Sequence, residues 1–283
     1  MPPVSLFLFQ GNSRLQFGPH RERARADAEM LLMHLLGRDR AWLIAHSSDE
    51  IEFDHWEPYF ELLQRRRLGE PIQYIIGKAE FYGLPFRVAP DVLIPRPETE
   101  YAVEKVIGLA ASFPSPRIVD IGTGSGAIAV AIARHAPNAT ITAIDLSEPA
   151  LTIARENAKR LGFADQIRFL QGDLLNPVAG EQFDIIVSNP PYVPEADRPT
   201  LSVEVRDHEP SLALFAGKDG LDIYRRLIPQ ALAHLVAGGY IALEIGYGQS
   251  PAILDLLSAA GFNNIEFTPD LQGIPRVATA QRP

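Results

Sequence analysis

The sequence predicts an α/β protein in which a Rossmann-like, doubly wound sheet of seven strands follows a small helical domain. Apolar residues recur at helical spacing up to about residue 75, whereas after residue 97 apolar runs alternate with helical patterns. Such alternation is typical of a mostly parallel sheet covered on both faces. The length of 283 residues accommodates both parts, because domains commonly comprise roughly 100–200 residues.

The N-terminal part is expected to be helical and to lead into a hairpin. Helical periodicity covers residues 21–36 and continues in a second segment that includes Trp56, Tyr59 and Leu63. The segments 80–82 and 85–88 flank a Gly-Leu pair, which predicts a short β-hairpin. We therefore expect a helical domain at 1–75, a hairpin and linker at 76–97, and the sheet domain at 98–283.

In the sheet domain, strands and helices should alternate up to the last two strands. The expected strands are Arg117–Ile121, Thr140–Asp145, Gln166–Gln171, Phe183–Ser188, Tyr240–Ile245, Asn264–Phe267 and Arg276–Thr279. The expected helices are Glu98–Ser112, Ala127–His135, Glu148–Leu161, Asp219–Val236 and Ser250–Ala260. Because no helix separates the final two strands, we expect them to form an antiparallel hairpin at the edge of the sheet.

The composition favours a folded cytoplasmic protein without a membrane partner. The absence of Cys excludes disulfides, thiolate zinc sites and a Cys nucleophile, and it fits a reducing compartment. No apolar stretch reaches the roughly 20 residues of a membrane span, and Val4–Phe9 lacks the basic segment that precedes a signal peptide core. The net charge of −9 disfavours broad attraction to nucleic acid, although a local basic groove would be compatible with it.

A glycine-rich turn is expected where the first strand of the sheet meets its helix. The turn reads Gly122, Thr123, Gly124, Ser125, Gly126. Glycines in such a turn permit positive φ angles and close approach of a ligand to the backbone, but a packing turn would have the same composition. The spacing differs from that of dinucleotide binders, and the Lys-Ser/Thr pair of a phosphate-binding loop is missing. A nucleoside-like ligand is therefore favoured over a pyrophosphate.

Two acidic residues follow the next strands at the same expected edge. Asp145 ends the second strand about 20 residues after the glycines, where a carboxylate can accept hydrogen bonds from ribose hydroxyls. A helix N-terminal role for the same segment remains compatible with this interpretation. Asp173 follows the third strand and is a candidate acceptor for an adenine amino group, but a loop Asp next to Gly is also a common turn residue.

The four residues Asn189, Pro190, Pro191 and Tyr192 come directly after the apolar strand 183–188. Two prolines cannot continue the sheet, so they hold the backbone carbonyls outward. The Asn189 side-chain oxygen and the Pro190 carbonyl can then accept both N–H groups of a substrate NH2, while Tyr192 packs on its planar face. The alternative is a rigid proline turn without a function. The seven His residues have no ligand spacing, so no metal site is expected.

These residues make the chain resemble the class I methyltransferases, and more narrowly the bacterial enzymes that methylate the glutamine of peptide chain release factors. Similar segments extend over about four-fifths of the chain. They include residues 69–77, 92–100 and 186–194, and further ones at 209–214, 219–222, 243–246 and 270–273.

The resemblance implies transfer of a methyl group from S-adenosylmethionine to the side-chain amide nitrogen N5 of the glutamine in a Gly-Gly-Gln sequence, a modification that belongs to translation termination. It implies that residues 122–126 and Asp145 bind the cofactor, that residues 189–192 hold the glutamine amide, and that residues 95–100 line the site. Leu174 occupies a position where some relatives have a large aromatic residue against the adenine. Asn189 would contact both cofactor and acceptor.

Three other functions remain alternatives. A ribosomal-protein glutamine methyltransferase would differ only in its docking domain. An adenine-N6 DNA methyltransferase would present the same four residues to a planar NH2, but it needs a basic channel and a base-flipping loop that do not stand out here. A partner-binding module without activity would not need intact motifs. We expect a monomer whose partners are class I release factors, with no direct nucleic acid contact.

Overall fold

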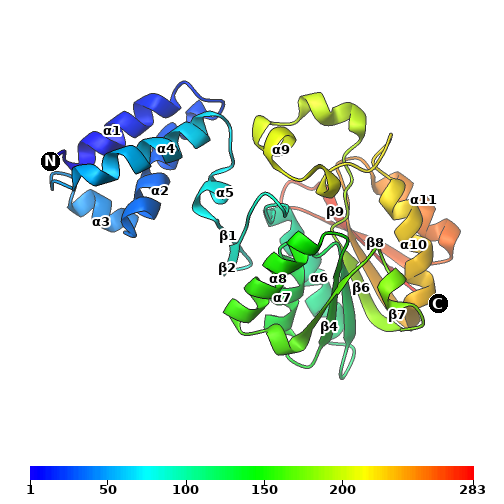
Figure 1. Cartoon of the computed structure of the whole chain (residues 1–283). Helices are drawn as coiled ribbons and strands as arrows, with labels where there is room; N and C mark the ends of the chain where they lie inside the picture. The colour runs from blue at the N-terminus through cyan, green and yellow to red at the C-terminus, as the bar shows by residue number, and fades with distance from the viewer. The chain divides into compact units, whose positions relative to one another are not determined.

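The computed structural model describes residues 1–283 and divides into two compact units (Figure 1). The helical unit comprises residues 1–78 together with 201–208. The sheet unit comprises residues 79–200 and 209–283. The chain therefore enters the helical unit twice, and the second entry was not anticipated from the sequence.

The helical unit packs its helices around one apolar core. Its elements are α1 (Val4–Leu15), α2 (Ala24–Leu36), α3 (Arg40–Ala45), α4 (Trp56–Arg67), α5 (Ile72–Ile76) and α9 (Val203–His208), with 3-10 turns at Arg21–Arg23 and Phe53–His55. Phe7 of α1 contacts the rings of Trp56 and Tyr59 in α4. The Tyr59 hydroxyl donates to the Ala28 carbonyl of α2 at 3.0 Å, which satisfies the polar end of a fully buried ring.

A buried arginine joins α9 to the rest of this unit. Arg66 in α4 is only 2% exposed, and its Nε donates to Asp27 Oδ2 at 2.6 Å. Its Nη1 donates to the Glu70 carbonyl and to the side chain of Glu204 in α9. Burial of a charge is costly unless it is paired, so this residue requires both carboxylates. The α9 segment thereby supplies a partner for the buried charge of a unit from which it is remote in sequence.

The sheet unit contains a seven-stranded sheet with the strand order β5-β4-β3-β6-β7-β9-β8. The strands are β3 (Arg117–Ile121), β4 (Thr140–Asp145), β5 (Ile167–Gln171), β6 (Phe183–Ser188), β7 (Leu235–Glu244), β8 (Asn263–Pro269) and β9 (Pro275–Gln281). The first five are parallel, whereas β9 is antiparallel to both β7 and β8. Strand β9 lies between its two partners.

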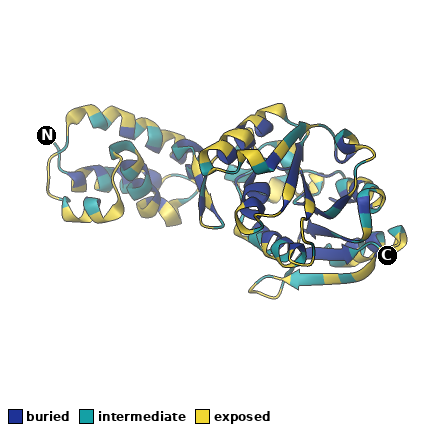
Figure 2. Ribbon diagram, turned by 90° about the horizontal axis from the view of Figure 1, so that it is seen from below, coloured by how far each residue is buried: buried dark blue, intermediate teal, exposed yellow.

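Helices cover both faces of the sheet (Figures 1 and 2). The helices are α6 (Glu100–Ala110), α7 (Ala127–His135), α8 (Glu148–Leu161), α10 (Asp222–His234) and α11 (Ser250–Ala260). One buried cluster joins α6 and α7 to alternate strand residues such as Ile118 and Ile185, and it also includes Phe81 and Phe86 of the hairpin β1 (Lys78–Phe81) and β2 (Leu84–Arg87). The other cluster joins α10 and α11 to the intervening strand residues. Successive side chains of a strand point to opposite faces of the sheet, so the buried strand residues alternate between the two core clusters.

The predicted fold class is confirmed, including the antiparallel edge. The differences concern boundaries and short elements. Predicted helix 219–236 is α10, which ends at His234, and β7 begins at Leu235 with a register shift before Tyr240. Predicted helix 98–112 is a 3-10 turn at Pro97–Thr99 followed by α6. Helices α1, α3, α5 and α9 were not predicted. Helices α3, α5 and α9 have only six, five and six residues, and short helices depend on tertiary contacts more than on local periodicity.

Candidate active site

The register of the central strands brings the glycine turn and Asn189 to the same edge of the sheet. Strands β3 and β6 are neighbours, and their last paired residues are Ile121 and Ser188. The Ser188 hydroxyl donates to the Ile121 carbonyl at 2.7 Å, which ties the two strand ends together. Gly122 directly follows β3, and Asn189 directly follows β6. This is the topological switch point, where doubly wound sheets bind their ligands.

The glycine turn is a backbone cradle open to a cavity. Gly122 and Gly124 have φ angles of 72° and 55°, and a Cβ atom at either position would meet no atom within 4 Å. The backbone N–H groups of Gly122 and Thr123 donate to the Ile144 carbonyl at 2.8 and 3.0 Å, which fixes the turn against β4. Gly126 has a different role, because a Cβ there would lie 3.1 Å from that of Ala154 in α8. Its small size permits close helix packing.

Asp145 is held beside this cradle by backbone donors. Its Oδ2 accepts from Gly124 N at 2.8 Å, and its Oδ1 accepts from Ser147 N at 2.9 Å. Burial raises the pKa of this carboxyl, while the hydrogen bonds from Ser147 and Gly124 lower it in part. The separate helix N-terminal role falls to Ser147, whose Oγ accepts from Ala150 N at 3.3 Å.

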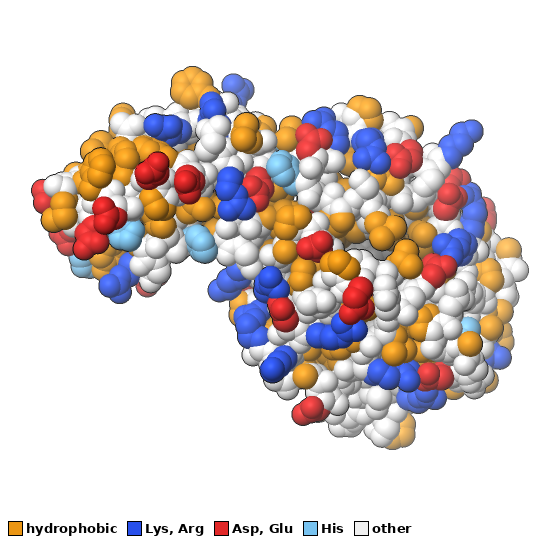
Figure 3. Space-filling view, viewed as in Figure 1, with side chains coloured by type: hydrophobic (Ala, Val, Ile, Leu, Met, Phe, Trp, Pro, Cys, Tyr) orange, Lys and Arg blue, Asp and Glu red, His pale blue; other side chains and the backbone are white.

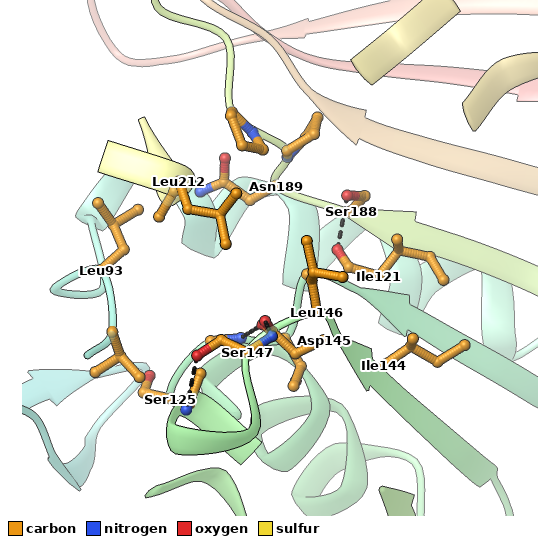
Figure 4. A pocket seen from close by; sticks show the side chains of 18 of the residues that line it. Leu93, Ile121, Ser125, Ile144, Asp145, Leu146, Ser147, Ser188, Asn189 and Leu212 are labelled. Atoms are coloured by element: carbon orange, nitrogen blue, oxygen red, sulfur yellow. Dashed lines mark hydrogen bonds between the residues drawn. The ribbon is translucent and has the colours of Figure 1, made fainter. Parts of the chain in front are cut away.

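A cavity of about 200 Å³ extends from the glycine turn to Asn189 (Figure 4). This is far larger than the roughly 10–15 Å³ that one water needs, so the cavity admits an organic ligand. Asp145 and Ser147 lie on one side of it, and Asn189 and Leu212 lie on the other. The lining also includes residues from 91–95, 172–174 and 210–213. A single cavity therefore contains both the residues predicted to bind a nucleoside and Asn189, which is predicted to bind an amide.

The Asn189 side chain has a defined orientation. Its Nδ2 donates to Thr99 Oγ1 at 3.0 Å, and no protein group donates to its Oδ1. The two prolines that follow end β6, and the chain then pairs with another loop: Val193 N donates to the Leu214 carbonyl and Ala216 N donates to the Val193 carbonyl. These bonds fix the turn after Asn189 without using its amide oxygen.

Behind Asn189 lies a buried carboxyl that the sequence did not single out. Glu244 ends β7, is 1% exposed and accepts from the Tyr192 hydroxyl at 3.4 Å. Burial raises the pKa of Glu244 to about 7, while hydrogen bonds from Thr99 and Tyr192 and the charge of Arg276 lower it and the charge of Glu98 raises it. Its backbone carbonyl accepts from the buried Tyr224 hydroxyl at 2.7 Å.

The structure brings most of the predicted site residues together. The cavity lining contains Gly122, Thr123, Gly124, Ser125, Asp145, Asp173, Leu174, Asn189, Pro190 and Pro191. Gly126 and Tyr192 are not part of it. The Asp173 carboxylate forms an ion pair with Arg226, and Leu174 has a positive φ of 51°. Pro95 and Thr99, from the segment expected to line the site, are in the lining. The functional roles of these residues stay predictions.

Asp120, below the glycine turn, is a second buried carboxyl that carried no predicted role. Its Oδ2 accepts from Thr123 Oγ1 at 2.6 Å, and its Oδ1 has no partner. Burial, partly opposed by the Thr123 hydrogen bond, raises the pKa of Asp120 to about 7. No signal in the sequence separated this residue or Glu244 from other carboxylates at strand positions.

We expect these two carboxyls to make the protein less stable as the pH rises from about 4 to about 7. Their folded-state pKa values of about 7 exceed the ordinary values of 3.8 and 4.5, so the folded state binds protons more tightly than the unfolded state. The stabilisation is complete below the ordinary values and is lost as the pH passes the raised ones. In urea unfolding at pH 5 and pH 8, Asp120→Asn should show a smaller loss of stability than the wild type. An unchanged loss would contradict the raised pKa of Asp120.

Comparisons with known proteins agree with this geometry. Family models match residues 10–77 (PrmC N-terminal domain) and 107–204 (methyltransferase small domain). A methyltransferase structure from Pyrococcus furiosus has a TM-score of 0.53 and 22% identity, covering 71% of this chain and 90% of that one, and therefore supports the fold alone.

Two curated relatives are release factor glutamine methyltransferases. The one from Koribacter versatilis is 45% identical over 92% of this chain and 91% of its own length. The one from Moorella thermoacetica is 44% identical over 92% of each. Together with the sheet and the cavity, these similarities define an S-adenosylmethionine-dependent methyltransferase. Within that class, the chain belongs to the release factor glutamine methyltransferase family. None of its helices is long and apolar enough to span a membrane.

Proposed function

We propose that the protein methylates the side-chain N5 of the glutamine in the Gly-Gly-Gln sequence of class I peptide chain release factors. The observation that carries the proposal is the position of Asn189, whose Oδ1 accepts from no protein group and which lines the same cavity as the glycine turn and Asp145. The relatives that share 44% or 45% of their residues with the chain over nine-tenths of its length support this substrate. A cytoplasmic location follows from it, because release factors act where translation takes place.

The cofactor half of the site fits S-adenosylmethionine. Gly122 and Gly124 leave open space where side chains would otherwise stand, so the amino-acid part of the cofactor can approach the backbone. Asp145 is fixed by Gly124 and Ser147 and retains lone pairs for the ribose hydroxyls. Asp173 and Leu174 lie in the same lining and are the candidates for adenine contacts, although the Asp173 carboxylate is shared with Arg226.

The part of the site around Asn189 and Pro190 would orient the glutamine amide. In the reaction, the glutamine nitrogen forms a bond to the methyl carbon as the carbon–sulfur bond breaks, and the nitrogen then loses a proton to water. An amide nitrogen is a poor nucleophile because its lone pair is delocalised. Asn189 Oδ1 and the Pro190 carbonyl would accept its two N–H bonds and stabilise the positive character that develops on them.

Tyr192 has a supporting place in this proposal. Its ring packs against the α10 and α11 side of the core, and its hydroxyl donates to Glu244. Because it does not line the cavity, we assign it to holding the turn that carries Asn189 and Pro190, and not to contact with the substrate amide.

The helical unit would dock the protein substrate. It exposes large apolar side chains, namely Phe9, Phe17, Ile44, Phe53 and Leu68, which are each between 64% and 84% exposed. Hydrophobic side chains gather over this unit in Figure 3. Exposed apolar groups of this kind are common where proteins bind other proteins. In the sheet unit, basic and acidic side chains are interspersed in the view of Figure 3, which favours a protein acceptor over DNA.

Labelled S-adenosylmethionine should identify the acceptor. The enzyme is incubated separately with a release factor, with ribosomal proteins and with DNA, and the methylated position is mapped by mass spectrometry. We expect label only on the Gly-Gly-Gln glutamine. Label on a ribosomal protein or on adenine, but not on the release factor, would replace the proposed substrate, and the absence of cofactor binding by calorimetry would refute the enzyme assignment.

Asp145→Ala should weaken S-adenosylmethionine binding about 10- to 100-fold, because hydrogen bonds to a charged group contribute roughly 1.5–3 kcal/mol. The variant removes the ribose acceptor and also the acceptor for Gly124 N. Isothermal titration calorimetry measures the effect. Asp255→Ala, an exposed position on α11, is the control. Equal dissociation constants for the two variants would exclude Asp145 from the cofactor site.

A further inference from the structure

An ion pair in the sheet unit joins two segments that line the cavity. Arg96 Nη2 donates to both carboxylate oxygens of Glu209, at 2.6 and 2.7 Å. Glu209 is only 5% exposed, whereas the Arg96 side chain is 32% exposed. Burial of a carboxylate is costly unless it is paired, so the arginine stabilises Glu209 in its buried position. The pair thereby connects parts of the chain that are 113 positions apart in the sequence.

Prolines restrict the backbone on both sides of the ion pair. Arg96 lies between Pro95 and Pro97, and its φ and ψ angles of −101° and 145° are extended, as expected for a residue before proline. Glu209 precedes Pro210, which has a φ angle of −67°. Pro95 and Pro210 both belong to the cavity lining. Because the backbone has little freedom here, the ion pair sets the relative position of the two lining segments.

The segment that follows Glu209 is held at both ends. We call residues 210–213, which include a 3-10 turn, the wall segment. The ion pair lies at its beginning. Beyond its end, Val193 N donates to the Leu214 carbonyl at 2.9 Å, and Ala216 N donates to the Val193 carbonyl at 3.0 Å. Val193 directly follows the Asn-Pro-Pro-Tyr turn, so the wall segment extends from the ion pair to the turn that is proposed to bind the substrate amide.

The two segments joined by the ion pair supply different neighbours to the acceptor site. In the wall segment, Leu212 lines the cavity while it is 58% exposed, and Figure 4 shows it on the same side of the cavity as Asn189. In the other segment, Thr99 accepts from Asn189 Nδ2 at 3.0 Å. Ligand sites commonly combine apolar walls with a few placed polar groups. Leu212 provides such a wall, and Thr99 orients such a polar group.

We propose, on the basis of the proposed function, that Arg96 and Glu209 are positioning residues for the methyl acceptor. Their ion pair fixes the wall segment, and with it Leu212, relative to the segment that contains Thr99. The cavity around Asn189 then keeps one shape, in which the substrate amide has one orientation toward the cofactor. Without the pair, the wall segment is anchored at its far end alone, and the acceptor loses alignment.

The cofactor half of the site does not depend on this ion pair. The glycine turn and Asp145 are held by hydrogen bonds to β4, to each other and to Ser147. None of these bonds involves the ion pair or the wall segment. Loss of the pair should therefore slow methyl transfer and leave the affinity for S-adenosylmethionine unchanged. A role in folding alone would change neither quantity per folded molecule.

Arg96→Met tests the proposal with a full-length release factor as acceptor. The single-turnover rate at saturating concentrations of both substrates should fall about tenfold or more, because small losses of alignment are costly. Calorimetry should give an unchanged dissociation constant for S-adenosylmethionine, and its stoichiometry gives the fraction of folded enzyme to which the rate is normalised. Arg96→Lys should retain most of the rate, because a single nitrogen of Arg96 contacts both carboxylate oxygens and an ammonium group can do the same.

Glu209→Gln is a second variant, because Arg96→Met leaves a buried carboxylate unpaired and is therefore expected to be destabilised. The glutamine keeps the shape of the side chain and removes its charge, and the rate should fall in the same way. Arg168→Met is the matched control. Arg168 Nη2 likewise donates to both carboxylate oxygens of Glu181, at 3.0 and 2.9 Å, but neither residue lines the cavity. This variant should methylate at the wild-type rate.

Four results would overturn the proposal: wild-type rates in Arg96→Met and Glu209→Gln, an equal loss in Arg168→Met, a rate in Arg96→Lys as low as in Arg96→Met, or weaker binding of S-adenosylmethionine by the variants of the pair. Absence of release factor methylation by the wild type would instead refute the proposed substrate.

Discussion

Replacing Asn189 with Ala is expected to lower kcat roughly 10²- to 10³-fold, the range found when one preorganised polar group that stabilises a transition state is removed. The variant loses the Oδ1 acceptor of a residue that lines the cavity, and with it one of the two groups proposed to orient the glutamine nitrogen. The Pro190 carbonyl remains, because the two prolines still end β6. Catalysis should therefore be impaired, not abolished.

The cofactor should bind this variant normally. The glycine turn and Asp145 are held by β3, β4 and their own backbone hydrogen bonds, none of which involves the Asn189 side chain. Single-turnover kinetics give the methyl-transfer rate, and calorimetry gives the dissociation constant for S-adenosylmethionine. Asn138→Ala, at an exposed residue outside the cavity, is the control. An Asn189→Ala enzyme with wild-type turnover would exclude this residue from the acceptor site.

The largest effect on stability is expected at Arg66. Arg66→Met should destabilise the helical unit by about 3–5 kcal/mol, because it leaves the buried Asp27 carboxylate without its main partner. Arg65→Met is the matched control: Arg65 is adjacent, but its side chain is 46% exposed and pairs with Glu70 near the surface. Exposed pairs contribute about 1 kcal/mol or less.

Tryptophan fluorescence can follow this unit selectively. The chain has two tryptophans, Trp42 and Trp56, and both belong to the helical unit. Urea titrations of Arg66→Met and Arg65→Met, monitored at these residues, should therefore differ clearly in midpoint. Adding Asp27→Asn to Arg66→Met should recover part of the loss, since the remaining buried group is then uncharged. Equal midpoints for the two single variants would show that the buried pair contributes little.

The strands of the sheet were predictable because each one is recognisable from its own short stretch of sequence. Buried parallel strands are apolar runs, and the runs ending at Ile121, Asp145 and Ser188 ended where predicted. The order of strands β3 and β6, and hence the meeting of the glycine turn with Asn189, followed from the general topology of doubly wound sheets. The family resemblance agreed with both.

The groups behind the site were not predictable, because their significance arises only from tertiary contacts. Thr99 was expected at the site only as one member of the segment 95–100, without a role of its own, and Glu244 was one acidic residue at the end of an apolar strand. Nothing in the local pattern connects Thr99 with Asn189 or Glu244 with Tyr192. The α9 segment was missed for the same reason, since its six residues are helical in the company of Arg66 and not by strong periodicity.

The double entry of the chain into the helical unit restricts how this protein can be recombined. A fragment that ends at residue 78 would lack Val203, whose side chain lies against Gly69, and Glu204, which pairs with Arg66. A sheet unit grafted onto another N-terminal part would carry an α9 without its native partners. Exchange of the helical unit between homologues should therefore succeed only when residues 201–208 are transferred together with residues 1–78. These two stretches are distant in sequence but must be exchanged as one structural unit.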